Sequence, residues 1–292
     1  MLPWEVRLTV CISAICQHNG EPRIVLCSDW MVDNEWMTSE TMNKQICIAP
    51  RWYALPAGSV ARGNELMAEF RIGFAKESPK IGRILPLFND IVNSRRRKII
   101  EETVQSAIGK EYEWLLEKGK ASLPDDSYSR LIQSVEYTKL GAQLILSGFV
   151  AEKDTGMNIP AVCSIDDSTA PCVRMAENFA TIGSGAVVAE SVLHRRSQQC
   201  DMPLKKTLYN VFEAKRLAEA SMGGSSGVGE TTTIGVLLPT GRYVNLSDKA
   251  VDFLAGCFTK YGPKALENSE SWDMMPHDFL KLEEPSAQSS VA

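Results

Sequence analysis

Histidine pairs and clustered cysteines, the usual ligands of zinc, are missing from this sequence. Only three histidines occur among its 292 residues, and none belongs to an HExxH-like motif. The eight cysteines form no CxxC pair and lie mostly in apolar segments. This pattern predicts buried, reduced thiols in a reducing cytoplasm rather than a zinc site or a disulfide framework. We therefore expect neither a metal ion nor an organic cofactor.

Long apolar runs and an excess of basic charge are also absent. No apolar run reaches the roughly 18 residues that a membrane-spanning helix needs, and Glu5 and Arg7 interrupt the N-terminus. Neither a signal peptide nor a membrane span is therefore predicted. The formal net charge of −5 argues against nucleic acid as the main partner. The one basic run, residues 95–98, precedes Glu101 and Glu102 and is interpreted as a solvated helix face.

The remaining composition is that of an ordinary globular protein, and its elements alternate in blocks. Apolar residues make up 44% of the chain and charged residues 23%, which suits one large core or two modest ones. The periodicity predicts strands, helices, strands, helices and strands in that order, which is typical of an α+β fold. Two antiparallel sheets between two helical layers, a four-layer αββα sandwich, would use all of these segments. Strands are expected near 9–15, 24–28, 44–48, 52–57, 141–150, 161–165, 172–175, 179–182, 231–238 and 242–246, and helices near 60–74, 84–120 (one helix, or two with a kink at Gly109), 128–137, 185–196 and 203–222.

Four polar or flexible groups stand at strand ends in the segment from residue 9 to residue 58. Thr9 shares one face of the first strand with Cys11, Ser13 and Ile15, and a hairpin with Asn19-Gly20 at its tip follows. The other strand ends carry the Asp29 carboxylate, the Lys44 ammonium and the Gly58 N–H, a set that can become a catalytic constellation. A later Gly-Ser-Gly motif, centred on Ser184, precedes a predicted helix.

Each of these residues also has a purely structural interpretation. Thr9 is a β-branched strand residue, Lys44 can be an edge-strand charge, and Asp29 can be an ordinary turn residue. Gly58 can simply permit a tight strand-to-helix turn, and Ser184 can cap the helix after it. Cys11 is interpreted as a core thiol rather than a nucleophile.

One apparent nucleotide-binding motif can be set aside. Residues 224–231, GSSGVGET, differ by one residue from the phosphate-loop pattern GxxxxGK[ST]. The difference places Glu230 where an ammonium would meet phosphate, and the loop follows a helix and enters a strand, the reverse of the required order. Nucleotide binding there is not expected.

These motifs, in this order, resemble those of the proteasome β-subunit family and its bacterial ring-forming relatives, the threonine N-terminal-nucleophile (Ntn) hydrolases. The resemblance runs from about Thr9 to Asp248. It is carried by Thr-x-x-x-Ser at the start, by Ser28-Asp29, by TMNKQICIAP at 41–50, by Ala57-Gly58 and by Gly183-Ser184-Gly185.

The resemblance implies a threonine peptidase or amidohydrolase that acts on a peptide or a small amide. It makes Thr9 the nucleophile, Asp29 the carboxylate that holds Lys44, and Gly58 the oxyanion-hole glycine. Ser184 would support the Thr9 amine. It further implies a homo-oligomer or ring, with an unfoldase as a possible partner.

The sequence departs from the family pattern at two places. The family expects an aspartate shortly before Ser-Gly-Gly, and the corresponding loop here has none; Glu219 stands in under one alignment, and Ser225 or Ser226 supplies the hydroxyl under another. A glycine commonly precedes the nucleophile, whereas this chain has Leu8, whose side chain resists the strained turn of self-cleavage. A non-catalytic subunit of an oligomeric assembly therefore remains an alternative, as does a stand-alone Ntn amidase.

The predicted domain organisation follows from the same resemblance. Residues 1–8 are expected to be a short propeptide or N-terminal extension, because the mechanism needs Thr9 at the N-terminus. Residues 9–261 form the Ntn-hydrolase-like domain, with an enlarged helical segment at about 84–137 that decorates a ring interface or blocks ring closure. Residues 262–292 are a polar C-terminal tail.

Overall fold

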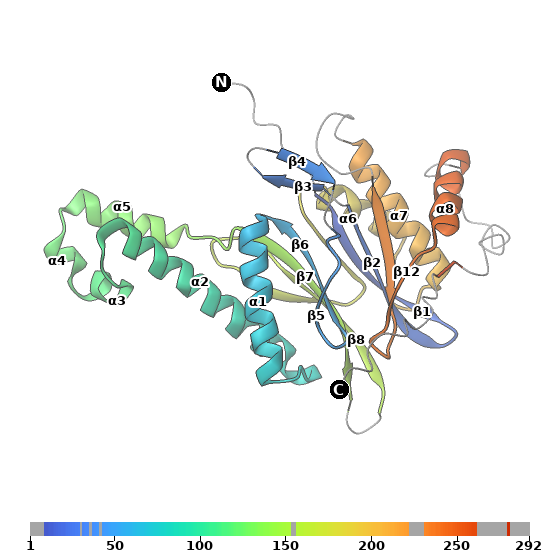
Figure 1. The fold of residues 1–292 in the computed structure, drawn as a ribbon, viewed down its shortest axis with the longest axis horizontal. Coiled ribbons are helices and arrows are strands. Elements are labelled where there is room, and N and C mark those ends of the chain that lie inside the picture. Colours follow the sequence, from blue (N-terminus) through green and yellow to red (C-terminus); the bar gives the residue numbers. More distant parts are fainter. Residues whose placement is uncertain are drawn as a thin grey trace, which may run out of the picture.

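The computed structural model describes residues 9–29, 31–34, 37–40, 43–152, 156–221, 231–261 and 279–280. The chain has an α+β fold that contains two five-stranded antiparallel sheets and helices packed beside them (Figure 1). The expected propeptide 1–8, the loop residues 222–226 and all of the expected tail except 279–280 lie outside the described residues. Within the described part of the chain, no helix combines the length and the apolarity needed to cross a membrane.

The first sheet contains the first two strands of the chain, β1 and β2, as inner strands. Its order is β10-β1-β2-β11-β12, and every neighbouring pair is antiparallel. Asn19 and Gly20, at the tip of the β1–β2 hairpin, have φ angles of 53° and 78°, so the predicted positive-φ turn is confirmed. The strands are β1 (Cys11–His18), β2 (Glu21–Asp29), β10 (Phe179–Ile182), β11 (Thr232–Leu237) and β12 (Tyr243–Asn245).

The second sheet runs in nearly sequential order, β5-β6-β7-β8-β9, and is also antiparallel throughout. Its strands are β5 (Ile46–Ala49), β6 (Trp52–Gly58), β7 (Ala142–Ala151), β8 (Asn158–Ile165) and β9 (Val173–Ala176). A separate hairpin of β3 (Met31–Asn34) and β4 (Met37–Glu40) was not predicted. Its short strands lack a glycine or proline turn signal, so the sequence pattern gave no reason to expect them.

The helices largely follow the prediction, with one open alternative resolved and two differences. The predicted 84–120 segment breaks at Gly109, whose φ of 67° ends α2 in the left-handed conformation, so the version with a kink is confirmed. The helix expected near 128–137 starts earlier, directly after Pro124, and has two aspartates in its first turn, where a helix N-terminus favours negative charge. Helix α8 was not predicted. The helices are α1 (Val60–Lys76), η1 (Ile81–Arg83), α2 (Ile84–Ile108), α3 (Tyr112–Trp114), η2 (Leu115–Gly119), α4 (Lys120–Ser122), α5 (Asp125–Glu136), α6 (Ala186–Arg195), α7 (Leu204–Ala220) and α8 (Asp248–Tyr261).

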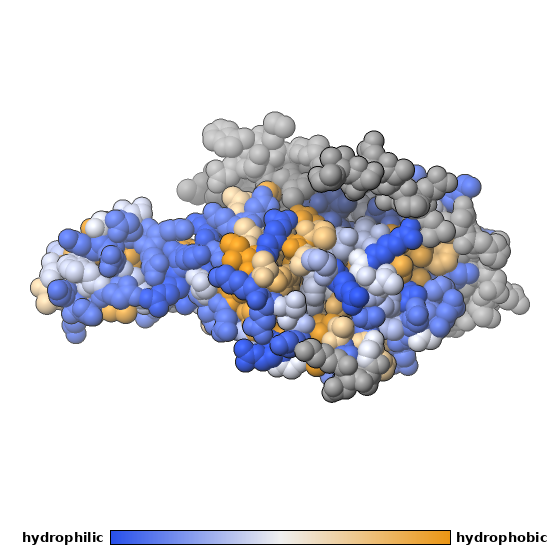
Figure 2. All heavy atoms as spheres, turned by 60° about the horizontal axis from the view of Figure 1, so that its bottom comes forward, coloured by the Kyte–Doolittle hydropathy of each residue, from blue (hydrophilic) through white to orange (hydrophobic). Residues whose placement is uncertain are grey.

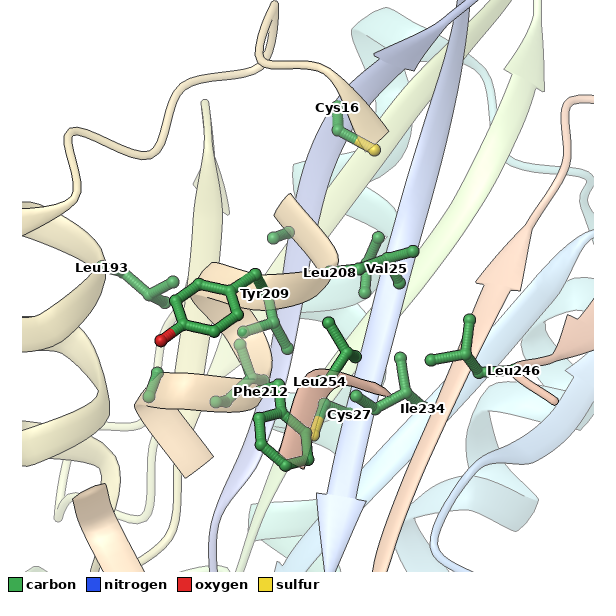
Figure 3. Close-up of a cluster of buried hydrophobic side chains, with 14 of the residues drawn as sticks. Cys16, Val25, Cys27, Leu193, Leu208, Tyr209, Phe212, Ile234, Leu246 and Leu254 are labelled. Carbon is green, nitrogen blue, oxygen red and sulfur yellow. The ribbon is translucent and has the colours of Figure 1, made fainter. Parts of the chain in front are cut away.

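The buried side chains form separate apolar clusters. One joins β1 and β2 to α6, α7 and α8; Figure 3 shows Leu208 and Phe212 of α7 against Val25 and Cys27 of β2. A second joins the strands of the second sheet to α1 and α2. A third contains residues of both sheets, and it includes Cys11 and Ile15, whereas Val10, Ile12 and Ala14 belong to the first cluster. The predicted division of the first strand into two faces is thus confirmed.

A helical arm projects from the body of the molecule. It consists of the second half of α2 followed by α3, η2, α4 and α5, and Figure 2 shows it with a largely hydrophilic surface (see also Figure 1). The arm has an apolar cluster of its own, with buried Ile100, Val104, Leu115, Leu131 and Val135.

The basic run at the root of this arm is only partly solvated, so its interpretation as a solvated face was wrong for one residue. Arg95 is 7% exposed and pairs with Glu65 of α1. Lys98 reaches Glu69 of the same helix at 2.5 Å, whereas Arg97 is 62% exposed. The run therefore joins α2 to α1, because Arg95 and Lys98 are three residues apart and lie on the same side of α2.

Candidate active site

Thr9 lies two residues before the start of β1, and a lysine reaches its hydroxyl. The Nζ of Lys44 donates a hydrogen bond to Thr9 Oγ1 over 3.0 Å. Thr9 is fixed by its backbone as well, since its carbonyl oxygen accepts from the Gly185 N–H at 3.2 Å. The side chain that could act as a nucleophile is thus held at both its oxygen and its main chain.

The same lysine forms a buried ion pair with Asp29. The Asp29 carboxylate, at the end of β2, is fully buried, and the Lys44 side chain is 6% exposed. Lys44 Nζ donates to Asp29 Oδ1 as well as to Thr9. A buried ammonium is costly unless a carboxylate compensates its charge. Asp29 therefore keeps a charged Lys44 next to the threonine oxygen.

Gln45, which the sequence analysis did not single out, fixes the backbone beside Lys44. Its side-chain NH2 donates to the Thr233 carbonyl at 2.9 Å and to Ser28 Oγ at 3.3 Å, and its oxygen accepts from Tyr243. Gln45 is 7% exposed. A buried polar side chain with all of these partners allows the segment before β5 few alternative positions. Apart from its place directly after Lys44, no local sequence signal marks it, because its partners are distant in the chain.

Ser184 supports the main chain of Thr9. Its hydroxyl oxygen accepts from the Thr9 N–H at 3.2 Å. The N-cap of α6 is Gly185 and has no side-chain capping bond, so Ser184 is not used as the helix cap. Gly183 has a φ of 91°, and a Cβ built there would lie 2.1 Å from the Thr9 carbonyl oxygen. Only glycine fits this close approach of the loop to Thr9.

Gly58 lies at the end of β6, where the strand turns into α1. It pairs with Ala142 of β7 and has a φ of 92°. The next residue, Ser59, donates its N–H to the Gly141 carbonyl at 3.0 Å. The structure thus brings together Thr9, Lys44, Asp29 and Ser184 by direct contacts, whereas in the described part of the chain Gly58 shares no hydrogen bond with Thr9.

The position of the missing family aspartate is only partly visible. Glu219, the candidate for the aspartate under one alignment, pairs with Lys215 at 2.9 Å and with Arg216 at 3.0 Å, both on its own helix α7. Its carboxylate is therefore engaged by two cations. The other candidates, Ser225 and Ser226, lie outside the described residues, as does Leu8.

Cys11 does not compete with Thr9 as a nucleophile. Its thiol is fully buried, and burial raises its pKa strongly. The nearby Lys44 ammonium opposes this shift but does not outweigh it. Cys11 Sγ contacts the Pro56 carbonyl of β6 at 3.5 Å, so Cys11 is the core thiol that was predicted.

Taken together, the arrangement can activate a hydroxyl. The described residues contain no group of three or more histidine, cysteine or acidic side chains placed to hold one. An ammonium at hydrogen-bond distance from a threonine oxygen favours the ionised form of that oxygen, and a carboxylate behind it holds the ammonium in place.

Searches against protein-family models and against curated proteins find no match to this chain.

Proposed function

We propose that this protein is an Ntn hydrolase of the proteasome β type, in which Thr9 attacks an amide or peptide bond. The observation that carries the proposal is the contact of Lys44 Nζ with both Thr9 Oγ1, at 3.0 Å, and the buried Asp29 carboxylate. An ordinary edge-strand lysine would point its ammonium into water, because a charged group is costly to bury. The contact between Ser184 Oγ and Thr9 N supports the same proposal.

In the proposed reaction, Thr9 is freed as the N-terminal residue by removal of the residues before it. Its α-amine then serves as the base, since an α-amine titrates near pH ~8 and a nearby ammonium favours its neutral form. The amine takes the Oγ1 proton as the oxygen attacks the substrate carbonyl. The proton passes to the leaving amine, an ester to Thr9 remains, and water hydrolyses this ester to release the acid and restore the threonine.

The developing oxyanion would be stabilised by a backbone donor. We assign this role to the Gly58 N–H, at the end of β6, where a single donor typically contributes roughly 3 kcal/mol. The tight pairing of Gly58 with Ala142 supports this role because it fixes the turn that carries the donor.

The layer order of the family is part of this proposal. A four-layer αββα sandwich accounts for the three apolar clusters of the body, two of which join one sheet to helices while the third holds residues of both sheets. The buried hydrogen bond between Ser13 and Ser147, at 2.8 Å, joins one strand of each sheet and agrees with this order.

The remaining features are proposed by resemblance alone. The protein would work in the cytoplasm as a homo-oligomer or ring on peptides or small amides, and it could receive substrates from an unfoldase. The helical arm exceeds what such a fold needs, so it would contact a neighbouring subunit or prevent a closed ring.

One observation favours the second candidate, a non-catalytic subunit that keeps the fold. Glu219, the possible replacement for the family aspartate, has its carboxylate occupied by Lys215 and Arg216. An acid that is already paired with two cations is poorly placed to support the Thr9 amine. In this case the Lys44–Asp29 pair would serve only to hold β2 to the segment before β5.

Intact-mass measurement combined with an electrophilic probe separates the two candidates. An Ntn hydrolase loses the residues before Thr9 during incubation and then reacts with a peptidyl epoxyketone, which bonds to an N-terminal threonine. Thr9→Ala should abolish both the trimming and the labelling, whereas the nearby strand variant Thr181→Ala should retain both. A wild-type chain that keeps its mass and stays unlabelled supports the non-catalytic subunit.

A further inference from the structure

The first residues of β7 contact two loops that are distant in sequence. On one side, the Gly141 carbonyl accepts from the Ser59 N–H at 3.0 Å, and Ala142 pairs with Gly58. On the other side, the Oε1 atom of Gln143 accepts from the Gly183 N–H at 2.8 Å. The segment 141–143 therefore contacts the Gly58 turn through its backbone and the loop that contains Ser184 through the Gln143 side chain.

The loop that Gln143 holds is the one that fixes Thr9. Ser184 Oγ accepts from Thr9 N at 3.2 Å, and the Gly185 N–H donates to the Thr9 carbonyl at 3.2 Å. Gly183 lies so close that a Cβ there would be 2.1 Å from the Thr9 carbonyl oxygen. Because these contacts hold the loop directly against Thr9, a displacement of the loop also displaces Thr9.

Gln143 is suited to this task by its chemistry and position. A Gly183 N–H needs an acceptor, so the amide oxygen of Gln143 must face it. The side chain is half-buried and reaches from β7 of the second sheet to the loop that follows β10 of the first sheet. The residue before β7 is held as well, because Asp167 Oδ1 accepts a hydrogen bond from the Gly141 N–H at 2.8 Å.

We propose that Gln143 is a positioning residue for the reaction at Thr9. It ties the Ser184 loop to the strand that also fixes the Gly58 turn, and thereby sets the position of the Thr9 oxygen and nitrogen relative to that turn. This inference rests on the proposed function for its kinetic consequence, but the hydrogen bond can be tested without it.

The first test removes the acceptor and keeps the length of the side chain. Gln143→Met should lower the maximal rate of Thr9 labelling by a peptidyl epoxyketone about 10- to 100-fold, because small misplacements of reacting groups cost this much. The concentration of probe at half-maximal rate should not change, since Gln143 is assigned no contact with the probe. The matched control is Gln17→Met, a half-buried strand glutamine about 26 Å along β1 from Thr9.

The second test restores the acceptor with a charge. Gln143→Glu should recover most of the labelling rate that Gln143→Met loses. The added carboxylate favours the protonated form of the Thr9 amine, so the pH midpoint of labelling should move to higher pH. If the introduced carboxylate did not reach the loop that contains Ser184, the pH midpoint would stay at its wild-type value.

A third measurement separates failure of this inference from failure of the proposed function. Amide hydrogen exchange of residues 183–186 should be faster in Gln143→Met than in the wild type and unchanged in Gln17→Met. If the wild type is not labelled at Thr9, the proposed function is wrong, and the exchange data alone decide whether Gln143 holds the loop. The inference is overturned if Gln143→Met shows wild-type amide exchange in residues 183–186. It is also overturned if Gln143→Met is labelled at the wild-type rate across the pH range.

Discussion

The two buried charges of Lys44 and Asp29 depend on each other. Removing one partner leaves the other charge buried and uncompensated, which typically lowers the free energy of unfolding by about 3–5 kcal/mol. Removing both partners lowers it much less. We expect Lys44→Met and Asp29→Asn each to lower the free energy of unfolding by roughly 3 kcal/mol in urea titrations. The double variant should lose clearly less than the sum of the single variants.

An exposed ion pair gives the control for this double-mutant cycle. Arg97 and Glu101 are 62% and 44% exposed, and their charges are screened by solvent. Removing either one should leave the unfolding free energy nearly unchanged, and the pair should show no coupling. Additive losses at Lys44 and Asp29 would contradict the buried pair on which the proposed function depends.

The cysteines give a second prediction at the residue scale. Burial raises the pKa of Cys16, Cys27 and Cys163 to about 12, so on the order of one thiol in ten thousand is ionised at pH 8. Cys47 and Cys200 are exposed. We expect iodoacetamide at pH 8 to modify these two in the native protein and to reach the three buried thiols only after unfolding. Peptide mass spectrometry assigns the modified residues, and native-state modification of Cys27 would show that the core opens.

At the scale of the elements, the loop after β10 must pass very close to Thr9. Gly183→Ala places a methyl group 2.1 Å from the Thr9 carbonyl oxygen. Gly20→Ala is the matched control, because Gly20 also has a positive φ but has open space around it. Backbone strain alone costs about 1 kcal/mol in either variant.

We therefore expect Gly20→Ala to lose only that strain energy and to keep Thr9 labelling at its wild-type rate. Gly183→Ala should be less stable than Gly20→Ala and should lose labelling, because the loop must move away from Thr9. Urea titration and the epoxyketone reaction measure the two effects. Equal behaviour of the two variants would show that the Ser184 loop tolerates displacement.

The strand ends of this site were predictable from the sequence, but the contacts between its parts were not. Thr9, Asp29 and Lys44 stand where alternation of apolar residues stops, which local periodicity reveals. Gln45 and Gln143 act through hydrogen bonds to residues between 17 and 198 positions away, and no local pattern encodes such distances. For the same reason the burial of Arg95 was missed, since its partner Glu65 belongs to another helix.

At the scale of the whole molecule, the arm and the body have different cores. The arm cluster around Leu115 contains only residues from α2 onward to α5, whereas the cluster of the body joins α1 and the first part of α2 to the second sheet. The ion pairs Arg95–Glu65 and Lys98–Glu69 join α2 to α1 at the root of the arm, before the residues of the arm cluster begin. The arm should therefore open without unfolding the body.

This separation predicts that equal truncations in the two cores act on different parts of the chain. Leu115 and Leu144 are both fully buried, so replacing either with alanine removes the same atoms at a typical cost of 2–5 kcal/mol. Leu115→Ala should accelerate amide hydrogen exchange in residues 100–136 and leave β6, β7 and β8 protected. Leu144→Ala should accelerate exchange in those strands and in α1. If Leu115→Ala reduced protection equally in both regions, arm and body would unfold as one cooperative unit, and the arm could not reorient toward a neighbouring subunit while the proposed site stayed intact.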